Sequence, residues 1–399
     1  AYNYVSRIRS HASIALYCGR NEGFPPETLN KELRQCVEQL HPAILYIQSS
    51  ADEGVSGHGP YHALPAKEYF ERQTGKLHSE RGMPNVMTYE GLARTLRPEK
   101  LWPQGDAWGK HDYTMQGAQR GEAFNKIVET AFGTVTDALH FAALAQWENY
   151  NGYRAMFESG SHDRMGLLIW MSHPCWPSLT WQTYDYYFEP TAAFFGCKKA
   201  CETVHIQWNA LTHMVEVVNI GACRHEDLTA ESRVLNVNGR PLDYRINRLY
   251  CGADTTILCN KVDAPQGTEG VYFIDLKLKD AHKKVVSENF YVCSTADGNY
   301  RELNNLAKSR LKVSGVWSEN SVTLRLKNTS EVPAMMLRLN LKATDGEQIL
   351  PVCYSDNYIH LMPDEEKKIV ISWKEEDLRG QKEKIEISGF NIDTLEHSR

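Results

Sequence analysis

The sequence has no long apolar segment and no excess of positive charge. None of its apolar runs approaches the roughly 20 residues that a membrane-spanning helix needs, so we expect no membrane partner. Lysine and arginine together number 44, against 50 aspartates and glutamates, which gives a net charge of −6. Because binding to nucleic-acid phosphates needs clustered basic residues, nucleic acid is not expected as a partner. A sugar, a peptide or a small molecule fits this composition better.

Paired cysteines and metal-ligand spacings are also lacking. The ten cysteines are scattered without a C-x-x-C pair, so buried free thiols are expected rather than disulfides or a metal site. The histidines show no metal-ligand spacing either. The chain opens with AYNYVSRIRS, which has neither an initiator methionine nor the layout of a signal peptide. We expect the true start upstream, which leaves the compartment, periplasmic and secreted locations included, open.

The first half of the chain alternates short apolar runs with helical stretches. Such alternation is typical of a mostly parallel sheet built from βα units. A long helix is predicted over residues 123–157 and further helices over PPETLNKELRQCVEQL and TAAFFGCKKACETV. The predicted strands are SIALYCG, AILYIQSS, GPYHAL, KLHSE and GLLIWMS.

The pattern changes near residue 205. Alternating stretches separated by Gly, Asn, Asp and Pro turns indicate antiparallel β-sandwiches. The clearest of these stretches are HMVEVVNI, GVYFIDLKLKD, SVTLRLKN, MMLRLNLKAT and KKIVISWK. We therefore predict an α/β domain over residues 1–205 and two immunoglobulin-like sandwiches over 206–300 and 301–399.

Two glutamates follow apolar strands directly. Glu22 comes after IALYCGRN and Glu80 after KLHS. In a βα barrel the C-terminal ends of the strands meet at one open mouth, so both carboxylates would point into the same bowl. Retaining glycosidases use a close pair of carboxylates, one as nucleophile and one as acid/base. The alternative is that Glu22 is a helix-start acid ahead of GFPPETL and that Glu80 is ion-paired with Arg81.

Aromatic residues concentrate near the end of the first half. The segment IWMSHPCWPSLTWQTYDYY contains Trp170, Trp176 and Trp181. Tryptophans at the mouth of a barrel would offer a floor for a sugar ring. Core packing is an equally good interpretation of each of the three.

These segments together resemble a known family. SIALYCGRNEG, KLHSERGMPNVMTYEGL and LIWMSHPCWPSLTWQTYDYYFEPTAAFFGCKKACETVHIQWN are similar to the catalytic half of family 2 glycoside hydrolases, which include β-galactosidases, β-glucuronidases, β-mannosidases and exo-β-glucosaminidases. VCYSDNYIHLMPDEEKKIVIS resembles the last sandwich of the mannosidase and glucosaminidase branch. The resemblance implies a partial (β/α)8 TIM barrel, strands four to eight, followed by two immunoglobulin-like β-sandwich domains.

The resemblance also implies roles for individual residues. Glu22 maps onto the acid/base and Glu80 onto the nucleophile of a retaining mechanism, which needs no cofactor. Asn21 maps onto the residue that binds the sugar 2-hydroxyl, and Trp170 onto the tryptophan beneath the terminal sugar. Two further segments, SGHGPYH and LWPQGDAWGKHDY, resemble loops that line the subsites, although ordinary loop packing explains them equally well. Their candidate residues are Tyr61, His62, Trp102, His111 and Asp112.

The implied substrate is a glycoside or oligosaccharide with a terminal β-linked sugar. Exo-β-glucosaminidases of this branch tend to carry Asp at the position of Glu22, so the Asn-Glu pair favours neutral sugars of the β-mannosidase or β-galactosidase type. A non-catalytic carbohydrate-binding or scaffold module is the alternative function.

Barrel strands one to three are absent from the sequence. Five strands cannot close a barrel, and we therefore expect the N-terminal part of the same enzyme as a partner. A short homologue with a rearranged barrel is the alternative.

Overall fold

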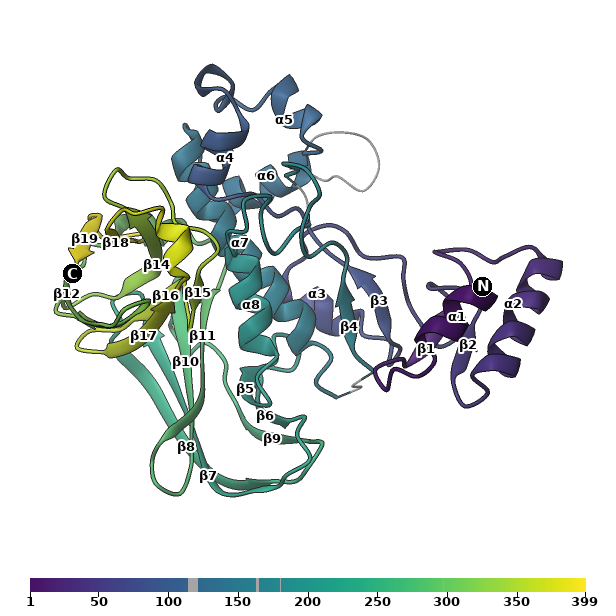
Figure 1. Ribbon diagram of the computed structural model, residues 1–399. Coiled ribbons are helices and arrows are strands. Elements are labelled where there is room, and N and C mark those ends of the chain that lie inside the picture. Colours follow the sequence, from purple (N-terminus) through teal and green to yellow (C-terminus); the bar gives the residue numbers. More distant parts are fainter. Residues whose placement is uncertain (114–120, 163–164, 180, 297) are drawn as a thin grey trace.

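The computed structural model describes residues 1–113, 121–162, 165–179, 181–296 and 298–399. In Figure 1 a small α/β unit at the N-terminus is followed by a helical region and then by two β units that carry the C-terminus. Within the described residues no helix is both long and apolar enough to cross a membrane.

The N-terminal unit is built around two parallel strands. Leu16–Cys18 (β1) pairs in parallel with Leu45–Ile47 (β2). Two helices, Tyr2–Ile8 (α1) and Glu27–Leu40 (α2), pack on this pair through a small separate core that includes Val5, Tyr17 and Val37. The strand predictions for SIALYCG and AILYIQSS are thus confirmed.

The second parallel pair consists of His78–Arg81 (β3) and Leu167–Ile169 (β4). A single parallel bridge from Val55 to Leu77 extends it on one side. The strand predicted over GPYHAL is wrong, because Gly59 has φ +77° and Pro60 has no amide hydrogen to donate to a ladder. Closure of these strands into a barrel stays a prediction.

The β3–β4 pair belongs to a mostly helical region (Figure 1). The helix predicted over 123–157 is in fact two helices, because Gly133 has φ +94° and Asp137 caps the second one by accepting a hydrogen bond from the His140 amide at 2.8 Å. The helices of this region are Ala66–Glu71 (α3), Tyr89–Thr95 (α4), Pro98–Lys100 (η1), Asp106–Lys110 (α5), Gly121–Phe132 (α6), Ala138–Glu158 (α7) and Ala192–Ala200 (α8).

Each β unit has two antiparallel sheets, and all five alternating stretches named above form strands. The first has sheet orders β5-β6-β9 and β11-β10-β7-β8, and the second β12-β13-β17-β15 and β16-β14-β18-β19. The domain boundaries stay predictions. The strands of the first unit are Val204–Trp208 (β5), Met214–Asn219 (β6), His225–Asn236 (β7), Pro241–Cys251 (β8), Thr255–Lys261 (β9), Val271–Lys279 (β10) and Val285–Ser294 (β11). Those of the second are Leu311–Trp317 (β12), Ser321–Asn328 (β13), Ala334–Ala343 (β14), Cys353–Tyr354 (β15), Ile359–Leu361 (β16), Glu366–Ser372 (β17), Glu383–Ser388 (β18) and Leu395–Ser398 (β19), with the 3-10 turns Arg301–Asn305 (η2) and Glu375–Leu378 (η3).

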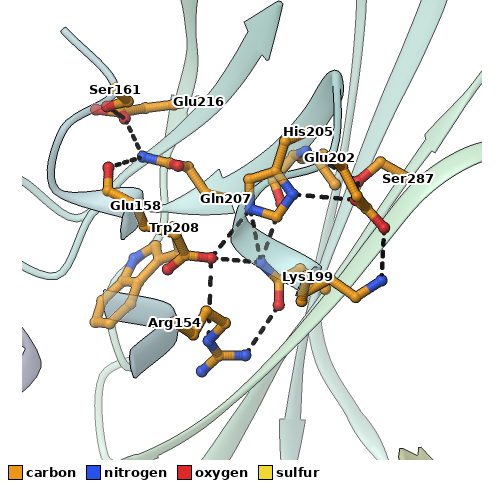
Figure 2. A network of polar contacts seen from close by, with 12 residues as sticks. Arg154, Glu158, Ser161, Lys199, Glu202, His205, Gln207, Trp208, Glu216 and Ser287 are labelled. Carbon is orange, nitrogen blue, oxygen red and sulfur yellow. Dashed lines mark hydrogen bonds and ion pairs between the residues drawn. The ribbon is translucent and has the colours of Figure 1, made fainter. Parts of the chain in front are cut away.

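A buried polar network fixes α7 to the first β unit (Figure 2). His205 of β5 lies between two carboxylates, with Nε2 3.1 Å from Glu158 of α7 and Nδ1 3.1 Å from Glu202. Asn289 of β11 donates to Glu158 at 2.7 Å and accepts from Arg154 at 2.9 Å. Because buried charges are costly unless they are paired, this network holds the helical region and the β unit in one relative position.

Candidate active site

Glu22 lies on a tight turn directly after β1. Its φ is +50°, a left-handed conformation that costs a non-glycine residue about 1–3 kcal/mol. Ser50, which follows β2, holds the turn. Its hydroxyl accepts from the Glu22 amide at 2.9 Å and donates to the Asn21 side chain at 3.4 Å, while its own amide donates to the Arg20 carbonyl at 3.0 Å. The end of β2 therefore fixes the direction of the Glu22 side chain.

Segment 56–62 brings Tyr61 to both glutamates. The segment is anchored to the strand region of Glu80, because the Ser56 amide donates to the Leu77 carbonyl at 2.8 Å. Gly57 permits the close approach, since a Cβ at this position would lie 2.5 Å from the Ser79 hydroxyl. The Tyr61 hydroxyl lies 3.1 Å from a Glu22 oxygen and also contacts a Glu80 oxygen. The structure therefore brings Glu22, Glu80 and Tyr61 together.

The next question is which of Tyr61, Glu22 and Glu80 can donate a hydrogen bond. The Tyr61 phenol has one hydrogen but three neighbouring acceptors, which are the two carboxylates and the Gly57 carbonyl at 3.1 Å. Burial raises the pKa of Tyr61 further, so the phenol keeps its proton. Burial also raises the pKa of Glu80, the hydrogen bond from Tyr61 lowers it, and the nearby Glu22 raises it. The pKa of Glu80 is raised overall, because burial and the neighbouring carboxyl group outweigh the hydrogen bond from Tyr61.

His58 lies on the solvent side of the pair. Its Nδ1 is 3.8 Å from a Glu22 oxygen, and the side chains of His58 and Glu22 are 66% and 41% exposed. No ion pair joins Glu80 to Arg81 in the described part of the chain, which is contrary to the alternative interpretation of Glu80. Ser50, Gly57 and His58 were not predicted from the sequence, although the glycine-rich SGHGPYH pointed to the loop that carries Gly57 and His58.

Two tryptophans form a wall beside Tyr61. The ring of Trp170 lies 5.0 Å from that of Tyr61 and 4.2 Å from that of Trp181. The Trp170 amide donates to the Arg81 carbonyl at 2.8 Å, which ties the wall to β3. Trp181 is only 6% exposed, while Gly82 leaves room for its ring. Trp170 and Trp181 thus lie with the glutamates.

The remaining candidate residues lie elsewhere. His111 and Trp176 stack on each other at 5.3 Å, and Trp176 is 41% exposed, so these two loops meet at the surface. Trp102 packs against Phe141 at 5.7 Å on the main core, in agreement with its packing interpretation. Asp112 has φ +71° beside His111. His62 follows Tyr61 and lines a cavity with it. Within the described residues, His111 and Trp176 thus contact each other and Trp102 contacts Phe141 rather than either glutamate.

Comparison with known proteins gives relatives that are named as exo-β-D-glucosaminidases and β-mannosidases. Residues 289–392 match the family model of the exo-β-D-glucosaminidase Ig-fold domain. An exo-β-D-glucosaminidase from Amycolatopsis orientalis is 25% identical, over 98% of this chain and 43% of the relative. A mannosylglycoprotein endo-β-mannosidase from Lilium longiflorum is 25% identical, over 100% of this chain and 54% of the relative. The chain thus spans about half the length of these relatives.

Solved structures show the same fold. An exo-chitosanase from Amycolatopsis orientalis aligns with a TM-score of 0.90 and 24% identity over 100% of this chain and 53% of its own. A β-D-mannosidase from Dictyoglomus thermophilum aligns with a TM-score of 0.80 and 18% identity over 98% of this chain and 50% of its own. An Ig-like domain is therefore present, as expected. The homologues of this chain are exo-β-D-glucosaminidases and β-mannosidases of glycoside hydrolase family 2, which confirms the family resemblance of the sequence.

Proposed function

We propose that this chain carries both catalytic carboxylates of a retaining exo-β-glycosidase that releases terminal β-linked sugars. The observation that supports this most is that Glu22 and Glu80 contact the same phenol oxygen of Tyr61. Two carboxylates with one shared hydrogen-bond partner are at most about two hydrogen-bond lengths apart, close to the roughly 5–5.5 Å separation in retaining enzymes. Inverting enzymes hold their carboxyl groups farther apart to admit a water molecule.

In the proposed mechanism Glu80 attacks the anomeric carbon while Glu22 protonates the leaving oxygen. Glu22 then deprotonates the water that releases the sugar from Glu80. This mechanism requires Glu22 to be protonated and Glu80 to be ionised when the glycoside binds. The hydrogen bond from Tyr61 supports the ionised form of Glu80, whereas burial and the nearby Glu22 oppose it and leave the pKa of Glu80 raised. Asn21 would bind the sugar 2-hydroxyl, and Trp170 would lie beneath the sugar ring.

We also propose that the parallel strands belong to a barrel that the N-terminal part of the enzyme completes. Leu45 of β2 and Leu168 of β4 are 61% and 57% exposed, which is unusual for strands of a parallel sheet because such strands are normally covered on both faces. Among the described residues, β1 has β2 as its sole strand partner. The relatives are about twice as long as this chain, which leaves room for the missing strands.

For the sugar we propose a neutral hexose, with mannose first. The β-mannosidases among the relatives and the Asn21-Glu22 pair support this choice. A panel of aryl β-glycosides in the manno, galacto, gluco and glucosamine configurations tests it on the complete enzyme. Fastest turnover of the mannoside is expected, and a preference for the glucosaminide would contradict the proposal. The lily relative is named an endo-enzyme. Release of monosaccharides alone from a β-mannan oligosaccharide distinguishes exo from endo action.

Substitution of the two glutamates tests their roles separately. Glu80→Gln is expected to lose nearly all turnover on every substrate, because no covalent intermediate can form. Glu22→Ala is expected to keep part of its turnover on aryl glycosides whose leaving group needs no proton, and little on natural glycosides. Wild-type turnover in Glu80→Gln would refute the assignment. Saturable sugar binding without any hydrolysis by the wild type would favour a non-catalytic binding module.

A further inference from the structure

A positively charged cavity lies against the segment that carries Tyr61. Its volume is about 370 Å³, within the range of small-ligand pockets. No aspartate or glutamate lines it within the described part of the chain. It is lined by Ser56, His58, Gly59, Pro60, Tyr61, His62, Arg72, His78 and Arg81, of which the two arginines carry positive charge.

Among the residues that the structure describes, Arg81, the most buried charge of this cavity, has no ion-pair partner. Arg81 is only 1% exposed, and its Nε and Nη1 atoms are buried without a hydrogen-bond partner. Burial lowers the pKa of Arg81, but an arginine keeps its proton in proteins. A buried cation without a counter-charge is strongly unfavourable, so an anionic group beside the Arg81 guanidinium would stabilise this region.

His78 adds a second unsatisfied group. It is 2% exposed, and both of its ring nitrogens are buried without a partner. Burial and the charge of Arg81 lower the pKa of His78 to about 4, so at neutral pH the ring is uncharged and has one N–H to donate. An extra residue in β3 lies between the pairs His78 with Leu167 and Arg81 with Ile169. Such a bulge changes the direction of the side chains that follow it. His78 and Arg81, which are three positions apart in the sequence, can therefore line the same cavity.

Arg72 gives the cavity mouth a second guanidinium. It lies on the solvent side, with 53% of its side chain exposed, and it is ion-paired at 2.8 Å with Glu68 of α3. A ligand that enters the cavity therefore passes one screened charge before it meets the unscreened charge of Arg81. This gradient favours an anion over a neutral molecule.

We propose that this cavity is a binding site for an oxyanion, namely a carboxylate, sulfate or phosphate group that is either free or carried by a sugar. The planar guanidinium of Arg81 matches two oxygens of such a group, and the His78 N–H can donate to a third. Because Tyr61 lies on the wall of the same cavity, the bound anion also holds segment 56–62 in place. The proposal does not rest on the hydrolytic reaction proposed above, although Tyr61 contacts both glutamates as well as the cavity.

Calorimetric titration of the full-length protein with sodium sulfate, at constant ionic strength in chloride, tests the proposal. Wild type is expected to bind sulfate saturably, and Arg81→Met to bind it about tenfold or more weakly, since a hydrogen bond to a charged group contributes at least that factor. Arg97→Met, which changes an exposed arginine outside the cavity, is the matched control and should bind like wild type. No saturable binding in the millimolar range, or equal binding by wild type and Arg81→Met, would overturn the proposal.

Two further measurements complete the test. Arg72→Met changes a half-exposed side chain at the mouth, so it keeps the core intact and should still weaken sulfate binding severalfold. An unchanged affinity in this variant would contradict the proposed entry path and with it the site. A monosaccharide sulfate and a hexuronic acid titrated in the same way identify the source of the group. Tighter binding than inorganic sulfate assigns the site to an acidic sugar, and weaker binding assigns it to a free anion.

Discussion

The Tyr61 hydroxyl is the part of the candidate site whose removal gives the sharpest test. Tyr61→Phe deletes the oxygen that contacts Glu22 and Glu80 but keeps the ring, which lies 5.0 Å from Trp170. A hydrogen bond to a charged group contributes about 1.5–3 kcal/mol. If this energy is realised in the transition state, kcat/KM of the complete enzyme on an aryl β-mannoside should fall about 10- to 100-fold.

The pH dependence should change in a definite direction. The hydrogen bond from Tyr61 lowers the pKa of Glu80, so its loss raises that pKa. A nucleophile must be ionised, and kcat/KM therefore falls as the pH drops through its pKa. In Tyr61→Phe the acid limb of the kcat/KM profile should move to higher pH.

Tyr244→Phe provides the control for this experiment. Tyr244 lies on β8 of the first β unit and is 49% exposed, so this substitution deletes a hydroxyl far along the chain from either glutamate. Its pH profile should coincide with that of wild type. An acid limb of Tyr61→Phe that stays in place, or that moves to lower pH, would refute the coupling of Tyr61 to Glu80.

Two further predictions concern segment 56–62 and the buried His205. Gly57→Ala places a Cβ 2.5 Å from the Ser79 hydroxyl. This displaces Tyr61, so kcat should fall at least tenfold. Gly54→Ala is the control, because nothing lies within 4 Å of its new Cβ, and it should have wild-type kinetics. Burial lowers the pKa of His205, but the hydrogen bonds to its two glutamates outweigh burial and raise it above the ordinary 6.5. The stabilisation of the folded state by protonated His205 is therefore complete below about pH 6.5, and it is lost as the pH rises through the raised pKa of His205. His205→Gln should lower the free energy of unfolding by about 3 kcal/mol or more at pH 6 and by less at high pH, as measured by urea unfolding. An equal loss of unfolding free energy at both pH values would argue against a charged His205.

Several features could be predicted from the sequence because they depend on local pattern. The alternation in HMVEVVNI and SVTLRLKN predicts strands, since one face of each must be buried, and these strands are confirmed. A glutamate directly after an apolar strand could likewise be recognised. The family resemblance was readable because its motifs lie within short segments such as KLHSERG.

Other features depend on backbone conformations that no pattern encodes. The apolar content of GPYHAL suggested a strand, yet the φ of Gly59 turns this segment so that Tyr61 reaches the two glutamates. The helical period of 123–157 hid a break at Gly133, because apolar periodicity continues on both sides of it.

The sequence by itself determined most of the element types, the two β units and the identity of two candidate carboxylates, because these depend on burial periodicity and on residue chemistry. Only the tertiary structure decided which groups meet. It brought Glu22 and Glu80 to one phenol, packed Trp102 against the core and left the Arg81 guanidinium without a counter-charge among the described residues. The physical reason is that such contacts join segments far apart in the chain, and their geometry is set by the packing of whole elements rather than by any local preference.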